Sequence, residues 1–75
     1  MPLTHKSYHP SSLLGLSREQ AATYVGVGTT LFDNMVTDGR MPKPKHVNKR
    51  RIWNRFEIEQ AFFNLPDDDN RWDEI

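Results

Sequence analysis

The chain has 75 residues, no cysteine and a formal net charge of zero, with ten Lys and Arg residues against ten Asp and Glu residues. A chain of this length forms one small domain that buries only about 60% of its unfolded surface, which excludes an enclosed catalytic cleft. The absence of cysteine excludes disulfides and thiolate metal sites, and no apolar run is long enough for a membrane span. The first residues lack the charged start and apolar core of a secretory signal, so we expect an intracellular, soluble protein.

Charge is distributed unevenly along the chain. The segment from Arg40 to Arg55 contains seven basic residues and no acidic residue. Residues 67–75 instead carry five acidic residues and a single basic one, Arg71. Such asymmetry indicates a polyanion-binding surface and a separate acidic tail. We therefore predict three regions: a flexible arm over residues 1–15, a domain over residues 16–66 and an acidic tail over residues 67–75.

A first helix is predicted over residues 18–25. Ser17 followed by Gln20 is a capping-box pattern, in which each side chain satisfies a free backbone N–H at the helix start. Apolar residues recur inside this segment at helical spacing, and Gly26 stands where a left-handed C-cap would end the helix. We expect this short helix to depend on tertiary contacts.

The second predicted helix covers residues 29–38, with Gly28 as its N-cap and Gly39 closing it. Its inward-facing stripe consists of Phe32, Met35 and Val36. The opposite face is polar and consists of Thr29, Thr30, Asp33, Asn34 and Thr37. This helix therefore contributes almost no positive charge of its own.

Extended structure is predicted after the second helix, because Pro42 and Pro44 prohibit helix and restrict the residues before them. Residues 45–47 and 51–53 are expected to pair as a two-stranded ribbon with its turn at residues 48–50. Because no Asn-Gly pair occurs there, the turn type stays open. Two aromatic residues are interpreted as core residues, Trp53 beneath the ribbon and Tyr24 in the first helix.

A third helix is predicted over residues 55–64, because Asn54 and Glu57 form a second capping-box pattern and Pro66 follows the helix. Its buried residues are expected to be Ile58, Ala61, Phe62 and Leu65. The tail after it is too acidic to fold alone and is interpreted as disordered or dependent on a partner. The whole pattern predicts a mainly helical domain with a small β-hairpin, in the order α-turn-α-β-β-α.

Two short helices separated by about three residues, the second with a polar outer face, have the form of a helix-turn-helix. Many small helical domains contain such a pair without binding DNA, so the hairpin that follows decides the interpretation. A ribbon with Lys and Arg along it can lie over phosphates while the second helix enters the major groove. We therefore predict a DNA-binding surface rather than a merely solvated hairpin.

Ordered landmarks between residues 16 and 62 support this prediction. They are the Leu16-Ser17 opening, the Ala21-Ala22 pair, Gly39 with Pro42, the Arg51-x-Trp53 strand and the Glu57-Ile58 pair. Together they resemble the excisionase and AlpA-type branch of the MerR-like winged helix-turn-helix proteins. The resemblance implies a directionality factor that binds and bends DNA cooperatively in site-specific recombination of a mobile element or prophage, or else a small transcriptional regulator. It also implies a bacterial or phage protein of the cytoplasm and nucleoid, with double-stranded DNA, other copies of itself and an integrase as partners.

The resemblance implies DNA contacts from the second helix and from the wing. In the helix these are the five polar residues of its outer face, with Thr30 and Asn34 as candidates for base edges because an amide can pair twice with adenine. Asp33 stands where family members often have an aromatic or basic residue, and its carboxylate either accepts from a cytosine amino group or repels phosphate. In the wing and its flanks the residues expected to neutralise phosphates are Arg40, Lys43, Lys45, His46, Lys49, Arg50, Arg51 and Arg55.

Other classes of function find less support in the sequence. An enzyme is not expected, since there is no nucleophile with a base, no glycine-rich phosphate loop and no hydride-transfer motif. We expect no cofactor, small-molecule substrate or membrane partner, and no metal, because His5, His9 and His46 lack ligand spacing. A protein-interaction module is the alternative of another class, in which the acidic tail acts together with the surplus side chains of Phe56, Phe63, Trp72 and Ile75.

Overall fold

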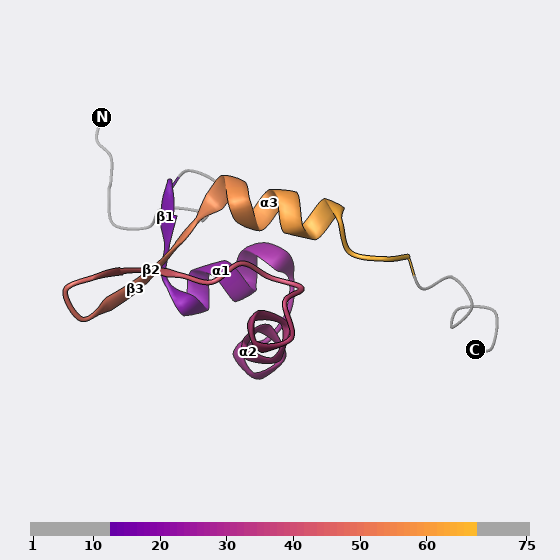
Figure 1. Ribbon diagram of the computed structural model, residues 1–75, viewed down its shortest axis with the longest axis horizontal. Coiled ribbons are helices and arrows are strands. Elements are labelled where there is room, and N and C mark those ends of the chain that lie inside the picture. The colour runs from indigo at the N-terminus through magenta and orange to yellow at the C-terminus, as the bar shows by residue number, and fades with distance from the viewer. Residues whose placement is uncertain (1–12, 68–75) are drawn as a thin grey trace, which may run out of the picture.

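Six short elements follow one another in a computed structural model that describes residues 13–67 (Figure 1). In chain order they are β1 (Gly15–Leu16), α1 (Arg18–Val25), α2 (Thr29–Thr37), β2 (Lys45–Val47), β3 (Arg50–Asn54) and α3 (Arg55–Phe63). The strands form one antiparallel sheet in the order β1-β3-β2. The described residues thus form a small α/β domain of three helices and a three-stranded sheet, in which no helix is long and apolar enough to cross a membrane.

Helix α1 lies in the middle of the domain. Both α2 and α3 pack against it, and Figure 1 shows them on different sides of it. The hairpin of β2 and β3 projects away from the helices, at the left of the view. This arrangement leaves the hairpin and the outer face of α2 accessible from outside the domain.

The helices begin and end where their capping residues predict. The Ser17 hydroxyl accepts from the Gln20 N–H at 3.2 Å, and the Gln20 side chain accepts from the Ser17 N–H at 2.9 Å, so the capping box before α1 is complete. Gly26 ends α1 in the left-handed conformation, with a φ of 93°. The Asn54 side chain accepts from the Phe56 and Glu57 N–H groups in the first turn of α3. The predicted bounds of all three helices are confirmed to within one residue.

The strand β1 is absent from the predicted α-turn-α-β-β-α order. Its two residues pair with the end of β3, Gly15 opposite Asn54 and Leu16 opposite Trp53. A strand of two residues leaves no alternating pattern in the sequence, and its pairing partner follows only after two helices. Residues 13–15, the described end of the predicted arm, therefore belong to the domain, whereas residues 1–12 and the tail beyond Asp67 lie outside the described residues.

The strands β2 and β3 form the predicted ribbon, with a turn of two residues. Val47 pairs with Arg50, so Arg50 begins β3 instead of lying in the turn as predicted. Asn48 has a φ of 57°, and no other non-glycine residue within 13–67 has a positive φ. Asparagine tolerates this left-handed region. A type I′ turn needs positive φ at both central residues, and Lys49 therefore excludes that type.

Trp53 is the centre of a small core, as predicted. Only 2% of its surface is exposed, and its ring packs edge-on against Phe32 of α2, with the ring centroids 5.2 Å apart. The indole Nε1–H donates to the Pro42 carbonyl at 2.8 Å, which satisfies the one polar atom of the side chain. The remaining buried residues of the described domain are Leu16, Ala21, Ala22, Phe32, Met35, Met41 and Ile58.

Phe62 was expected in the core but is 47% exposed. Ile58, one turn earlier on the same face of α3, is fully buried. Phe62 instead lines a hollow together with Val25, the last residue of α1. Helical periodicity predicts which face of α3 points inward, but it does not indicate where the covering helix ends.

Replacing Gly15 by alanine is expected to weaken the attachment of β1. The added Cβ would lie 2.7 Å from the Cγ2 atom of Ile52, which branches at Cβ and is therefore stiff at χ1. We expect Gly15→Ala to lower the free energy of unfolding by about 1 to 3 kcal/mol, measured by urea titration.

The matched control for this change is Gly28→Ser. Gly28 has a φ of −79°, nothing lies within 4 Å of an added Cβ, and serine is a better helix N-cap than glycine. This variant should be at least as stable as the parent chain. If Gly15→Ala were equally stable, the close approach of β1 to Ile52 would not constrain the fold.

Candidate nucleic-acid interface

The outer face of α2 is polar, as predicted. Thr30, Asn34 and Thr37 are exposed, whereas Thr29 and Asp33 are half-buried. The helix starts three residues after the left-handed Gly26, so a tight turn separates it from α1. The two helices pack against each other on either side of this turn, and the exposed polar side chains of α2 point away from the core.

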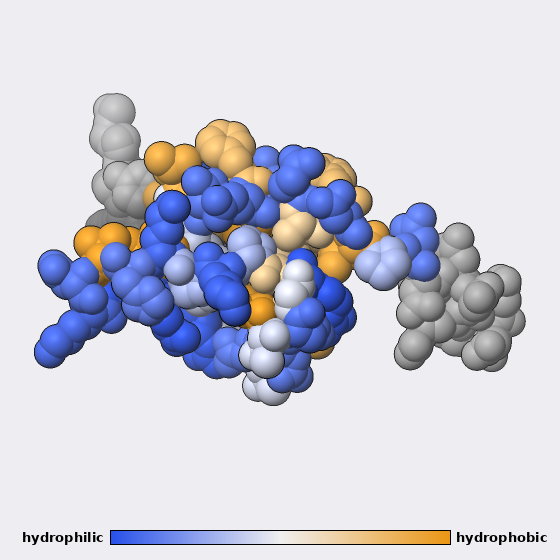
Figure 2. Space-filling view, viewed as in Figure 1, coloured by the Kyte–Doolittle hydropathy of each residue, from blue (hydrophilic) through white to orange (hydrophobic). Residues whose placement is uncertain are grey.

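The hairpin presents basic side chains on both of its faces. Residues opposite each other in an antiparallel pair lie on the same face of the sheet. Lys45 lies opposite Ile52, and His46 lies opposite Arg51, so a basic residue occurs on each side of the ribbon. Figure 2 shows hydrophilic residues over most of the hairpin, at the left of the view. The exposed basic and imidazole side chains of the hairpin are those of Lys45, His46, Lys49, Arg50 and Arg51.

One hairpin arginine lies beside the core. The Arg51 guanidinium lies 5.9 Å from the centroid of the Trp53 ring, within the range of a cation–π interaction. Arg51 and Trp53 are two residues apart in β3 and therefore share a face of the sheet. The buried tryptophan thus restricts the position of an exposed charge.

Two of the predicted contact residues are engaged by neighbouring groups. Arg40 pairs with Asp38 at the end of α2, with 2.8 Å between Nη2 and Oδ2, and this hydrogen bond lowers the pKa of Asp38. Arg55 lies 3.7 Å from the Glu59 carboxylate, and its guanidinium stacks over the Phe56 ring. Within residues 13–67, no ion pair involves Lys43, Lys45, Lys49 or Arg50.

Asp33 is bound by an arginine that the sequence analysis did not select. Arg18, the first residue of α1, donates from Nε to Oδ1 at 2.9 Å and from Nη2 to Oδ2 at 2.7 Å. The Arg18 hydrogen bonds hold the pKa of Asp33 below its ordinary value, and partial burial opposes this shift. The two residues are 15 positions apart, a separation at which no local pattern reveals a pair. The carboxylate on the outer face of α2 is therefore neutralised within the domain.

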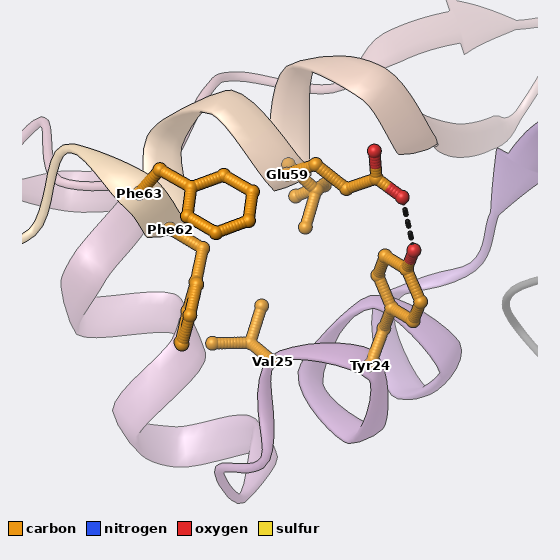
Figure 3. Close-up of a pocket in the computed structure, with 6 residues that line it drawn as sticks. Tyr24, Val25, Glu59, Phe62 and Phe63 are labelled. Atoms are coloured by element: carbon orange, nitrogen blue, oxygen red, sulfur yellow. Dashed lines mark hydrogen bonds between the residues drawn. The ribbon is translucent and has the colours of Figure 1, made fainter.

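A second surface lies between the ends of α1 and α3. It is a hollow of about 440 Å³ to which both helices contribute apolar side chains, and Figure 3 shows Val25, Phe62 and Phe63 around it. Tyr24, expected in the core, is only half-buried and packs against it, and its hydroxyl donates to the Glu59 carboxylate at one end of the hollow. No residue that lines this hollow belongs to the predicted DNA contacts.

Two of the four side chains expected in a protein-interaction module belong to the described residues. Phe56 and Phe63 are exposed, whereas Trp72 and Ile75 lie outside the described part.

No group of three or more His, Asp or Glu side chains within residues 13–67 could hold a metal ion, and His5 and His9 lie outside that range.

Comparison with known protein families, with curated proteins and with solved structures gives no match for this chain. Its function therefore has to be inferred from its own residues and their geometry.

The pair between Arg18 and Asp33 predicts a dependence of stability on pH. The pKa of Asp33 is lower in the folded chain than its ordinary value of 3.8, so the charged form is favoured by folding. The resulting stability is fully present above the ordinary pKa and is lost as the pH falls through the lowered one.

Asp33→Asn should therefore flatten the fall in the free energy of unfolding between about pH 5 and pH 2, measured by urea titration at each pH. Arg18→Met should have the same effect, because it removes the group that lowers the pKa of Asp33. Asp38 still titrates in both variants, so some pH dependence should remain. Parallel pH profiles for the parent chain and Asp33→Asn would contradict the assignment.

Proposed function

We propose that this chain binds double-stranded DNA as a winged helix-turn-helix protein. In this proposal α2 enters the major groove and the hairpin of β2 and β3 lies over the phosphates of the backbone. The observation that carries it is the hairpin itself, whose Lys45, Lys49 and Arg50 are exposed and make no ion pair within the described domain. Cations that have no internal partner are free to neutralise phosphates and release counterions.

The ion pairs at α2 also support the proposal that α2 enters the groove while the hairpin binds phosphates. Both acidic residues of its outer face and C-terminal end are paired, Asp33 with Arg18 and Asp38 with Arg40. The helix thus presents a nearly neutral polar face to a duplex instead of a repulsive one. Base recognition is then a task for the exposed side chains of Thr30 and Asn34, while the hairpin supplies most of the electrostatic affinity.

The additional strand β1 is compatible with a wing. It pairs with β3 on the edge opposite β2, so it supports the base of the hairpin and leaves β2 and the turn uncovered. The element order differs from α-turn-α-β-β-α only by this strand at the start. A three-stranded sheet of this kind holds the hairpin more firmly than a free two-stranded ribbon.

The biological role that we propose follows from the resemblance described above. It is control of the direction of site-specific recombination in a mobile element, with other copies of the chain and an integrase as partners, and transcriptional regulation is the alternative. Both roles require binding to a DNA site and bending of it. An integrase encoded beside this chain would favour the recombination role, and its absence would favour regulation.

Binding to a duplex of random sequence, measured by fluorescence anisotropy at several salt concentrations, tests the proposal. The logarithm of the binding constant should fall linearly with the logarithm of the salt concentration, and Arg50→Ala should reduce this slope by about one. Arg40→Ala is the matched control, because the Arg40 charge is already paired with Asp38 and should affect the slope less. Failure of the parent chain to bind any duplex would reject DNA binding as its function.

Asn34→Ala tests the proposed contact with bases. A preferred site is first selected from random duplexes with the parent chain. On that site Asn34→Ala should weaken binding by about 1 to 3 kcal/mol, while binding to random duplex stays nearly unchanged. Arg50→Ala should instead weaken binding to both duplexes by a similar factor. An equal loss on both duplexes for Asn34→Ala would show that Asn34 reads no base.

A further inference from the structure

A polar hollow of about 400 Å³ lies between the start of α1 and the hairpin. Three arginines line it, Arg18 from α1 and Arg50 and Arg51 from β3. Arg50 and Arg51 are neighbours in β3, so their side chains point to opposite faces of the sheet, and Arg51 is the one whose charge acts on Asp33. The hollow therefore adjoins the hairpin of the proposed DNA interface, and the bond from Arg18 to Asp33 connects it to α2.

Arg18 lines this hollow and has N–H donors that Asp33 does not use. A guanidinium has five N–H donors, and Asp33 accepts from one on Nε and one on Nη2. The other three, on Nη1 and Nη2, remain for a further acceptor, and the Arg18 side chain is 31% exposed. Because the carboxylate binds one edge of the planar group in two places, the orientation of the remaining donors is fixed.

Arg18, Arg51 and Asp33 together carry an excess of one positive charge. Asp33 does not line the hollow but pairs with Arg18, and Glu19, which does line it, is 73% exposed. Glu19 lies 3.9 Å from Nη1 of Arg18, which is beyond hydrogen-bond distance. A phosphodiester group of a DNA backbone carries a single negative charge and accepts hydrogen bonds through its oxygens, so it matches this excess.

We infer that Arg18 and Arg51 form a binding site for one backbone phosphate, and that Asp33 is the positioning residue of Arg18. The inference rests on the proposed binding of duplex DNA and adds a contact from α1 to those of α2 and the hairpin. It also gives Asp33 a role that is neither recognition of cytosine nor repulsion of phosphate. The carboxylate orients an arginine toward the same strand of DNA that the hairpin follows.

The test measures binding of the full chain to random duplex at several salt concentrations. Arg18→Gln keeps an amide donor for Asp33 but removes the charge, so it should reduce the salt slope by about one, as Arg18→Ala should. Each variant is checked for folding by its unfolding transition, and Arg18→Gln carries the test if Arg18→Ala does not fold. Both should weaken binding to all duplexes by a similar factor, because a phosphate contact does not depend on sequence.

Asp33→Asn distinguishes positioning from repulsion. With Arg18 present, this change should weaken binding, although the chain gains one positive charge, because Arg18 loses its orientation. In the Arg18→Gln background the same change should strengthen binding, since it then only removes a negative charge that repels phosphate. The two effects should differ by at least about threefold, as coupled neighbours do. Glu19→Gln, which removes a carboxylate that does not orient Arg18, is the matched control and should not weaken binding in either background.

The possible results test the phosphate site, the positioning role of Asp33 and the proposed DNA binding separately. Duplex binding by the parent chain with an unchanged salt slope for Arg18→Gln would overturn the phosphate site while leaving the proposed function intact. A loss confined to particular sequences would make Arg18 a base contact instead. Tighter binding by Asp33→Asn with Arg18 present would overturn the positioning role. Absence of duplex binding by the parent chain would overturn both the function and the site.

Discussion

The burial of Trp53 is the interaction on which the arrangement of this domain depends. Its ring packs against Phe32 of α2, its indole donates to Pro42 in the segment before β2, and its backbone pairs with Leu16 of β1. The same strand carries the arginines of the hairpin. One side chain thus sets the position of the hairpin relative to α2, and a core of only eight buried residues in the described domain is enough to do so.

Electrostatic pairing explains how a chain without net charge presents a basic surface. The acidic residues of α2 are neutralised close to where they occur, by Arg18 and Arg40. Within the part of the chain that the structure describes, no ion pair neutralises Lys45, Lys49 or Arg50 of the hairpin. The local balance of charge, rather than the total, therefore decides which surface attracts a polyanion.

The sequence predicted those features whose causes are local. The helix bounds follow from capping residues such as Ser17 and Asn54, which act on backbone groups within one turn, and they are confirmed. The strand β1 and the pair between Arg18 and Asp33 were missed, because both join residues that are separated by whole elements. The exposed position of Phe62 was missed for a related reason, since it depends on where α1 ends. The assignment of α2 and the hairpin to DNA stays a prediction.

The strand order β1-β3-β2 leaves β2 as an open edge of the sheet. An open edge offers unpaired backbone N–H and C=O groups to strands of other molecules and is a site at which aggregation can start. In this domain the edge strand has only three residues, follows Pro44 and begins with Lys45. Short length, proline and lysine each discourage the addition of a foreign strand. Lys45, which we propose to bind phosphate, thereby also discourages self-association of the sheet.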